Sequence, residues 1–186
     1  PLVDVLHGKK SLSLGRGLGS GSYRKDVSPW VIGYILGVEW EDVTVAYTNE
    51  KYPGRNSYQG TYMVTTEDAT PFEAMLAQVG DSIIEYETSR YRQRLVAFSN
   101  WPTTDPFLYP VEITSFFMKC AQVDVEHIKT TDAFLSGHFA SYHVYPYYPD
   151  YMYYVLNPIE IFDENDVSGM PLSQGVPIED VLTGSR

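Results

Sequence analysis

The feature that most constrains this chain is a nearly continuous apolar run, PWVIGYILGVEW, from Pro29 to Trp40. Only Gly33 and Gly37 interrupt it before the acidic residues that follow. A strand that is covered on both faces has such a run, because neither face alternates with water, and strands of this kind occur in parallel sheets flanked by helices. We therefore predict a buried strand here, with Glu39 at its carboxyl end.

The clearest predicted helix starts in the stretch TPFE. Thr70 suits the N-cap, Pro71 suits the first helical position, and Glu73 completes a capping box. Apolar residues then recur at helical spacing through Tyr86: Phe72, Met75, Leu76, Val79 and Ile83. A second buried strand is predicted from Leu95 to Phe98. Strand, helix and strand form a βαβ unit, whose two strands should be parallel with a right-handed crossover.

The remaining segments give weaker signals. A third strand is predicted from Phe139 to Val144, and a short one from Leu2 to Leu6. The segment SLSLGRGLGSGSY at 11–23 is expected to be a flexible loop, because its glycines match neither G-x-G-x-x-G nor a phosphate loop. Residues 48–62 are expected to form a long loop. The stretch AQVDVEHI, at 121–128, is predicted to be a short strand or a loop over the sheet.

Composition narrows the class of protein. The 186 residues, 44% of them hydrophobic, suit one domain with a core. A net charge of -11 without a basic run argues against a nucleic-acid partner. The single cysteine, Cys120, excludes an internal disulfide and is expected to be a packing residue. No membrane-crossing run or signal peptide is apparent. His138 and His143 have no compact ligand set around them, so neither a metal nor a cofactor is predicted.

Polar and aromatic residues lie at the end of each predicted buried strand. They are Glu39 and Trp40 at the first, Asn100 and Trp101 at the second, and His143, Tyr145 and Tyr147 at the third. Functional groups of α/β proteins gather beyond the carboxyl ends of parallel strands, so we expect these side chains at one rim. Aromatic faces stack on sugar rings, and Asn, His and Tyr hydrogen-bond hydroxyls. The predicted partner is therefore an oligosaccharide or polysaccharide.

The tyrosine-rich run FASYHVYPYYPDYMYY, from Phe139 to Tyr154, favours the same conclusion. A buried sheet would use Val, Ile and Leu, because a tyrosine hydroxyl in a core needs a hydrogen-bond partner. A half-exposed surface that binds a flat, hydroxylated ligand fits the run better.

Several of these segments together resemble clan A glycoside hydrolases. VIGYILGVEW looks like their fourth strand, which ends in the acid/base glutamate, and SYHVYP resembles the H-x-Y-P segment of their sixth strand. LVAFSNW would then be the fifth strand and VDVLHG the end of the third. The resemblance covers roughly Leu2 to Asp150 and implies a partial (β/α)8 TIM-barrel sheet in a domain at 1–154. Residues 155–186 are predicted to be irregular or poorly ordered.

The resemblance implies roles for individual residues. Glu39 matches the acid/base, which protonates the departing glycosidic oxygen and later activates water. His143 and Tyr145 match the H-x-Y pair that contacts substrate and supports the nucleophile. One departure is Val38, because the family usually has an asparagine there that hydrogen-bonds the sugar 2-hydroxyl.

A second departure concerns the nucleophile. A retaining mechanism needs another carboxylate about 5 to 5.5 Å from the first, which the family carries on its seventh strand. The chain is shorter than the ~250 residues of a typical barrel, and no seventh strand is apparent. Glu160, in NPIEIF, is a weak candidate without a family match. Glu126 is expected to line the pocket, or else to be a solvated loop charge or a partner of His127.

Three hypotheses follow. The first is a glycoside hydrolase domain with Glu39 as proton donor, inactive in this chain if no second carboxylate completes it. The second is a non-catalytic carbohydrate-binding or interaction protein on a degenerate barrel. A nucleotide-dependent transferase is the third, and the lack of a phosphate loop argues against it. Glu39 capping a strand and His143 orienting its neighbours are the structural alternatives.

Two expectations concern the setting of the protein. An open sheet edge would favour a homo-oligomer. The carbohydrate hypothesis favours an extracellular or cell-surface location.

Overall fold

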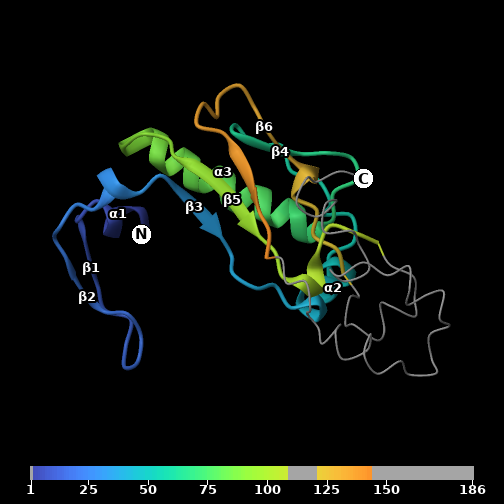
Figure 1. Ribbon diagram of the computed structural model, residues 1–186, viewed down its shortest axis with the longest axis horizontal. Helices are drawn as coiled ribbons and strands as arrows, with labels where there is room; N and C mark the ends of the chain where they lie inside the picture. The colour runs from blue at the N-terminus through green and yellow to red at the C-terminus, as the bar shows by residue number, and fades with distance from the viewer. Residues whose placement is uncertain (1, 109–120, 144–186) are drawn as a thin grey trace, which may run out of the picture.

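The computed structural model describes residues 2–108 and 121–143, and within them the chain is a mixed α/β structure (Figure 1). Its α-helices are α1 (Leu2–Leu6), α2 (Asp42–Lys51) and α3 (Pro71–Arg90). Short 3-10 turns lie at η1 (Ser28–Trp30), η2 (Pro102–Thr104) and η3 (Val125–His127). The strands are β1 (Lys10–Leu12), β2 (Gly21–Tyr23), β3 (Gly33–Leu36), β4 (Met63–Thr65), β5 (Leu95–Ser99), β6 (Ile128–Thr130) and β7 (His138–Ser141).

A parallel sheet with the order β3-β5-β7 forms the centre of the structure. Tyr34 pairs with Val96, and Val96 pairs with His138, so the three strands share one register. The predicted strands and their parallel pairing are confirmed, although β3 is shorter than the run from Pro29 to Trp40. At the carboxyl end Gly37 has φ +88 and turns the chain, and at the amino end Ser28–Trp30 form the turn η1.

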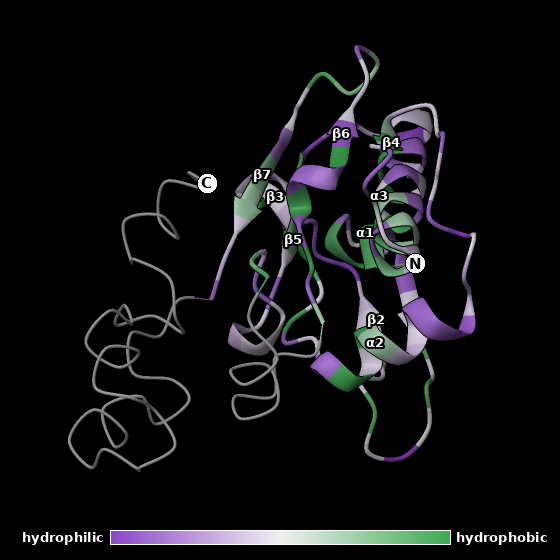
Figure 2. Cartoon of the chain, turned by 90° about the vertical axis from the view of Figure 1, so that its right-hand side faces the viewer, coloured by the Kyte–Doolittle hydropathy of each residue, from purple (hydrophilic) through white to green (hydrophobic). Residues whose placement is uncertain are grey.

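Helix α3 covers one face of this sheet (Figure 2). The predicted capping box is confirmed, with the Thr70 side chain accepting from the Glu73 N–H while the Glu73 carboxylate accepts from the Thr70 N–H. Gly80 lets the helix approach closely. A Cβ atom there would lie 2.5 Å from Met63 Sδ and 2.9 Å from Phe98 Cζ.

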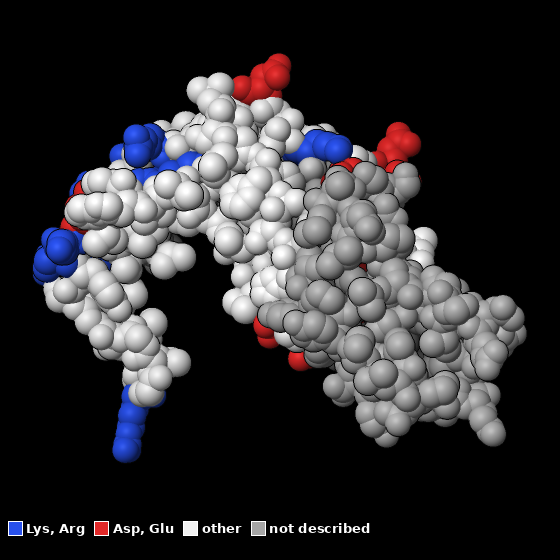
Figure 3. All heavy atoms as spheres, viewed as in Figure 1, with Lys and Arg blue, Asp and Glu red and all other residues white. Residues whose placement is uncertain are grey.

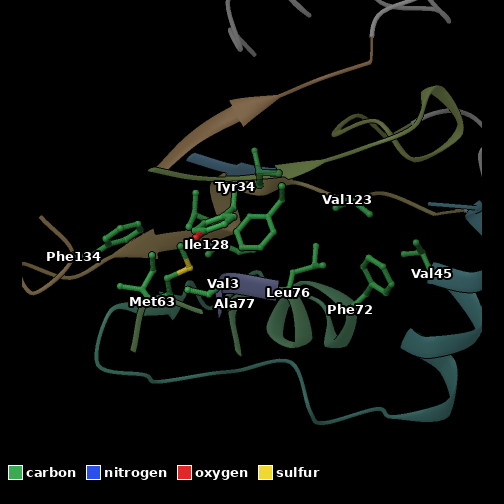
Figure 4. Packing of buried hydrophobic residues seen from close by; sticks show 14 residues of the cluster. Val3, Tyr34, Val45, Met63, Phe72, Leu76, Ala77, Val123, Ile128 and Phe134 are labelled. Carbon is green, nitrogen blue, oxygen red and sulfur yellow. The ribbon is translucent and has the colours of Figure 1, made fainter. Parts of the chain in front are cut away.

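The core lies between α3 and the sheet, and Figure 4 shows part of it. Phe98 on the central strand is fully buried, as are Met63 on β4 and Ile84 on α3. Burying side chains of this size stabilises the fold by about 1.5–3 kcal/mol each. The core therefore joins segments that are far apart in the sequence into one unit.

The opposite face of the sheet carries an apolar row across all three strands. Ile35, Ala97 and Phe139 are register partners, so their side chains share this face. Ile35 and Phe139 on the outer strands are exposed, whereas Ala97 between them is buried. Within the described ranges the three strands form an open sheet and no closed barrel.

The predicted strand at Leu2–Leu6 is wrong, because these residues form helix α1. Tertiary contacts outweigh the weak strand pattern of this short segment. Val3 is buried, and the Asp4 carboxylate accepts hydrogen bonds from the hydroxyls of Tyr86 (2.7 Å) and Tyr91 (3.1 Å). The bond from Tyr86, above all, lowers the pKa of Asp4.

The segment predicted as a flexible loop at 11–23 contains a β-hairpin instead. Strands β1 and β2 pair antiparallel, with Lys10 opposite Tyr23 and the Ser11 and Ser22 hydroxyls 3.1 Å apart. Gly15 and Gly17 have positive φ in the connection, which explains how the glycine-rich stretch can reverse the chain.

One other segment differs from prediction, and at 121–127 the loop alternative, rather than a strand, is found. The expected loop at 48–62 begins inside α2, whose Asn49 side chain accepts from the Phe72 N–H at the start of α3 (2.9 Å). The segment 121–128 ends in the turn η3 and the first residue of β6, and β6 pairs antiparallel with β4. These short pieces owe their structure to tertiary contacts.

No helix in the described ranges has both the length and the apolar character to cross a membrane. Residue 154, the predicted end of the domain, and the segment 155–186 lie outside the described residues, as does Val144 of the third predicted strand.

Candidate functional site

The carboxyl ends of β3, β5 and β7 lie at one edge of the sheet, since the strands are parallel. This edge brings Glu39 and His143 together, with His143 Nδ1 3.8 Å from Glu39 Oε1. The Glu39 side chain is 46% exposed and that of His143 is 28% exposed. A carboxyl group and an imidazole thus meet where a ligand could reach both.

Gly37 and Trp40 shape the turn that presents Glu39. The Trp40 indole folds back under the turn, where its Nε1–H donates to the Ser99 carbonyl (2.8 Å) and its ring meets Phe72 edge-on. A Cβ atom at Gly37 would overlap this indole. Trp40 therefore supports the turn from inside, and its indole donor is not available to a ligand.

Asn100 also faces inward. Its side chain is 1% exposed, and its Oδ1 accepts from the His143 N–H (3.0 Å). Asn100 thereby fixes the backbone where the chain leaves β7. Its side-chain oxygen is bonded to the protein backbone, so it positions His143.

Ser99 is a site residue to which the sequence analysis assigned no role. Its hydroxyl donates to the Val38 carbonyl and lies 3.5 Å from His143 Nε2. The signal was present in the sequence, because a buried apolar strand that ends in Ser and Asn places two polar groups at the rim. Ser99 links the turn after β3 to the imidazole on the third strand.

Trp101 forms an aromatic wall beside the imidazole. Its ring meets His143 edge-on, with centroids 5.8 Å apart. Its backbone N–H donates to Thr104 Oγ1, and the Thr104 hydroxyl also lies 3.3 Å from the Trp40 carbonyl. The buried turn η2 therefore holds Trp101 in place, half-exposed at the rim.

Glu126 is exposed in η3, and its backbone N–H donates to Asp124 Oδ1 (3.0 Å). His127 is bound by Glu73, whose Oε2 lies 2.9 Å from His127 Nδ1. The alternative prediction, a pairing of Glu126 with His127, is therefore wrong. His127 pairs instead with Glu73, the third residue of α3. Among the described residues, no recorded contact joins Glu126 to Glu39 or His143.

The other predicted residues lie beyond the described ranges. They are Tyr145, Tyr147, Glu160 and Cys120, together with most of the tyrosine-rich run. Within 2–108 and 121–143, no three His, Cys, Asp or Glu side chains are grouped to hold a metal ion. His138 instead packs edge-on against Phe98, and burial lowers its pKa.

No protein-family model, curated protein or solved structure matches this chain. Its function is therefore argued from the geometry of the rim.

Proposed function

We propose that the rim is a carbohydrate site of the glycoside hydrolase type, with Glu39 as the proton donor. The observation that carries the proposal is the meeting of Glu39 and His143 at the carboxyl ends of parallel strands, with Trp101 beside them. A half-exposed acid can reach a glycosidic oxygen, and an aromatic wall can stack on a sugar ring. His143, held by Asn100, would orient the carboxyl group.

The proposed step is general acid catalysis. Protonated Glu39 gives its proton to the glycosidic oxygen while the bond from the anomeric carbon to that oxygen breaks. The bonding electron pair stays on the departing oxygen, which leaves as an alcohol. Water then adds to the anomeric carbon and loses a proton to a carboxylate, so that the ring is left with a new hydroxyl.

The step needs a second carboxylate, about 5 to 5.5 Å away in retaining enzymes and about 6.5 to 9.5 Å away in inverting ones. Glu126 is not joined to the rim by a recorded contact, and Glu160 lies outside the described residues. We propose that a carboxylate beyond the described ranges completes the pair.

The proposal extends to the architecture. The three parallel strands would be part of a partial (β/α)8 barrel that stays open at the β3 edge, with α3 on the outside. The apolar row of Ile35, Ala97 and Phe139 supports this, because the inner face of a barrel is filled by side chains in layers.

Val38 favours a second function, non-catalytic carbohydrate binding. Its side chain is apolar and 69% exposed, so it cannot hydrogen-bond a sugar hydroxyl in the way the family's asparagine would. In this case the aromatic rim would still recognise the ligand, and no second carboxylate would be needed.

Glu39→Gln tests the catalytic function, and Glu41→Gln is its matched control two residues away on the exposed surface. Hydrolysis of a panel of glycosides should fall by about 10²- to 10⁴-fold in the first variant and stay unchanged in the second. Equal rates in wild type and Glu39→Gln would remove Glu39 from the mechanism.

Calorimetric titration with oligosaccharides separates the two functions. Binding without hydrolysis, weakened by Trp101→Ala, would support the non-catalytic function. Neither hydrolysis nor binding across the panel would overturn both.

A further inference from the structure

The first strand of the sheet has a free, apolar edge. Trp30, Ile32, Ile35 and Val38 lie along β3 and its two ends, and they are 73%, 83%, 56% and 69% exposed. Within the described ranges β3 pairs with β5 alone, so its other edge has no partner strand. An exposed apolar edge of this kind promotes pairing with another chain unless something covers it.

Charge is distributed unevenly about this edge. The β1–β2 hairpin lies on the N-terminal side of β3, and the segment from Lys9 to Lys25, here called the arm, contains five basic residues and no acidic one: Lys9, Lys10, Arg16, Arg24 and Lys25. At the other end of β3, Glu39 and Glu41 follow directly. The free edge therefore runs from a basic end to an acidic end, in a chain whose net charge is -11.

The arm also stands apart from the body of the protein. Figure 3 shows it projecting away, with blue basic atoms at its tip and a hollow between it and the rest of the molecule. Leu14 and Leu18, near its tip, are 52% and 63% exposed. Because the arm carries basic residues and exposed leucines, it can bind an acidic, partly apolar protein surface.

We propose that a second copy of this chain covers the β3 edge, with the two β3 strands antiparallel about a two-fold axis. In this arrangement the basic end of each copy faces the acidic end of the other, and the attraction occurs twice. A parallel arrangement would put like charges together. The charge pattern thus selects both the partner and its orientation.

The arm is essential to this interface. β3 has only four residues, and a strand pair of that length buries too little surface to hold two chains together. The arm of each copy would extend across the other copy and add its leucines and cations to the contact. The proposal is independent of the carbohydrate function, because it rests on the edge and the arm.

Sedimentation equilibrium of the full chain tests the proposal. The mass should rise with concentration from 21.1 kDa towards twice that value. A single mass of one copy at all concentrations would overturn the proposal, as would growth beyond two copies. Raising the salt should weaken the dimer, because exposed charges are screened. A dimer that tightens with salt would contradict the charge pattern.

A pair of charge reversals tests the orientation. Arg16→Glu and Glu41→Lys should each raise the dissociation constant by about tenfold or more, because like charges then face each other. An equal mixture of the two variants should restore the dimer, since each mixed contact again joins opposite charges. Failure of the mixture to restore it would exclude the antiparallel arrangement.

Ile32→Lys/Ile35→Lys tests the edge itself and should abolish the dimer. Met75→Lys is its control, because Met75 is 39% exposed on α3, the helix that covers the other face of the sheet. Circular dichroism would show that each variant still folds. If the wild type is monomeric and binds anionic phosphatidylserine vesicles through the arm, the partner is a membrane. The proposed second copy would then be wrong.

Discussion

The two ends of the parallel sheet each hold a carboxylate, a histidine and an aromatic ring, but in different environments. At the amino end, Glu87 is fully buried and its Oε2 lies 2.5 Å from Arg94 Nη1. The Tyr34 hydroxyl donates to Glu87 Oε1 (2.6 Å), and His7 stacks on the Tyr91 ring. The carboxylate of Glu87 is thus enclosed by groups of the protein itself.

At the carboxyl end, Glu39 is nearly half-exposed, and its recorded partner is His143 at 3.8 Å. A buried charge destabilises the folded protein unless partners compensate it. At the amino end, Arg94 and Tyr34 are these partners of Glu87, so the cluster is part of the folded structure. The carboxyl-end pair remains open to a ligand. The comparison indicates a structural role for the amino-end cluster and supports the functional role proposed for the carboxyl-end pair.

Among the substitutions that test this comparison, Arg94→Met should lower the stability of the protein most. It leaves Glu87 buried without its cation, which should lower the free energy of unfolding by about 3–5 kcal/mol in urea denaturation. Arg92→Met, at an exposed neighbour, should change it by less than about 0.5 kcal/mol. Because the cost comes from an unpaired charge, Glu87→Leu in the Arg94→Met background should recover part of the loss. If no stability is recovered, the cluster stabilises the fold through interactions other than the pairing of the two charges.

Tyr34→Phe should have the next largest effect. It removes a hydrogen bond to a buried carboxylate, worth about 1.5–3 kcal/mol. Burial, and then the bond to Glu87, raises the pKa of Tyr34 above its ordinary value. The hydroxyl therefore stabilises the fold fully below about pH 10, and this contribution is lost as the pH rises through and beyond 10.

The measurement for Tyr34→Phe is the urea midpoint as a function of pH. Wild type should lose stability faster than the variant above about pH 10, so the two curves should converge. Parallel curves throughout the alkaline range would show that the Tyr34 hydroxyl is not linked to folding.

Protonation of His138 at acidic pH should have a smaller effect on stability. Burial, and then the nearby Lys129, lowers the pKa of His138, so its neutral form is favoured in the folded state. Stability should be full above the ordinary histidine pKa of about 6.5 and fall as the pH decreases below it. At one pH unit below this ordinary pKa, His138 cannot lower the free energy of unfolding by more than about 1.4 kcal/mol.

His138→Leu removes this titration while the other histidines remain. The difference between urea midpoints at neutral and at acidic pH should therefore be smaller in the variant than in wild type. A difference of equal size in both proteins would assign the acid sensitivity to other groups.

The central part of the fold was predictable from the sequence because its signals are local. The apolar runs at 29–40 and 95–98 indicate buried strands, and the capping box at Thr70 marks where α3 begins. Helix α1 and the strand pair β4–β6 were not predictable in the same way. Each is five residues or fewer, and contacts such as Asp4 with Tyr86 and Tyr91 decide its conformation.

The same distinction applies to the rim. The sequence predicts which residues follow each strand, and parallel pairing brings them to one edge. It does not indicate which way each side chain turns. Trp40 and Asn100 turn inward to bind Ser99 and the His143 backbone, because a donor or amide next to a buried strand end finds its partner in the protein.

Glu39→Gln should have the smallest effect on stability and is the direct counterpart of Glu87→Gln. The same change of one oxygen to an amide is made at both ends of the sheet. At Glu39 the pair with His143 is exposed, and such pairs contribute about 0–1 kcal/mol. We expect the free energy of unfolding to change by less than about 0.5 kcal/mol, whereas Glu87→Gln should cost several times more, because the buried Arg94 loses its counter-charge. Urea denaturation of both variants beside wild type measures the difference. A large loss at Glu39 would make it a structural residue, and the contrast between the two ends would no longer support a ligand site at the rim.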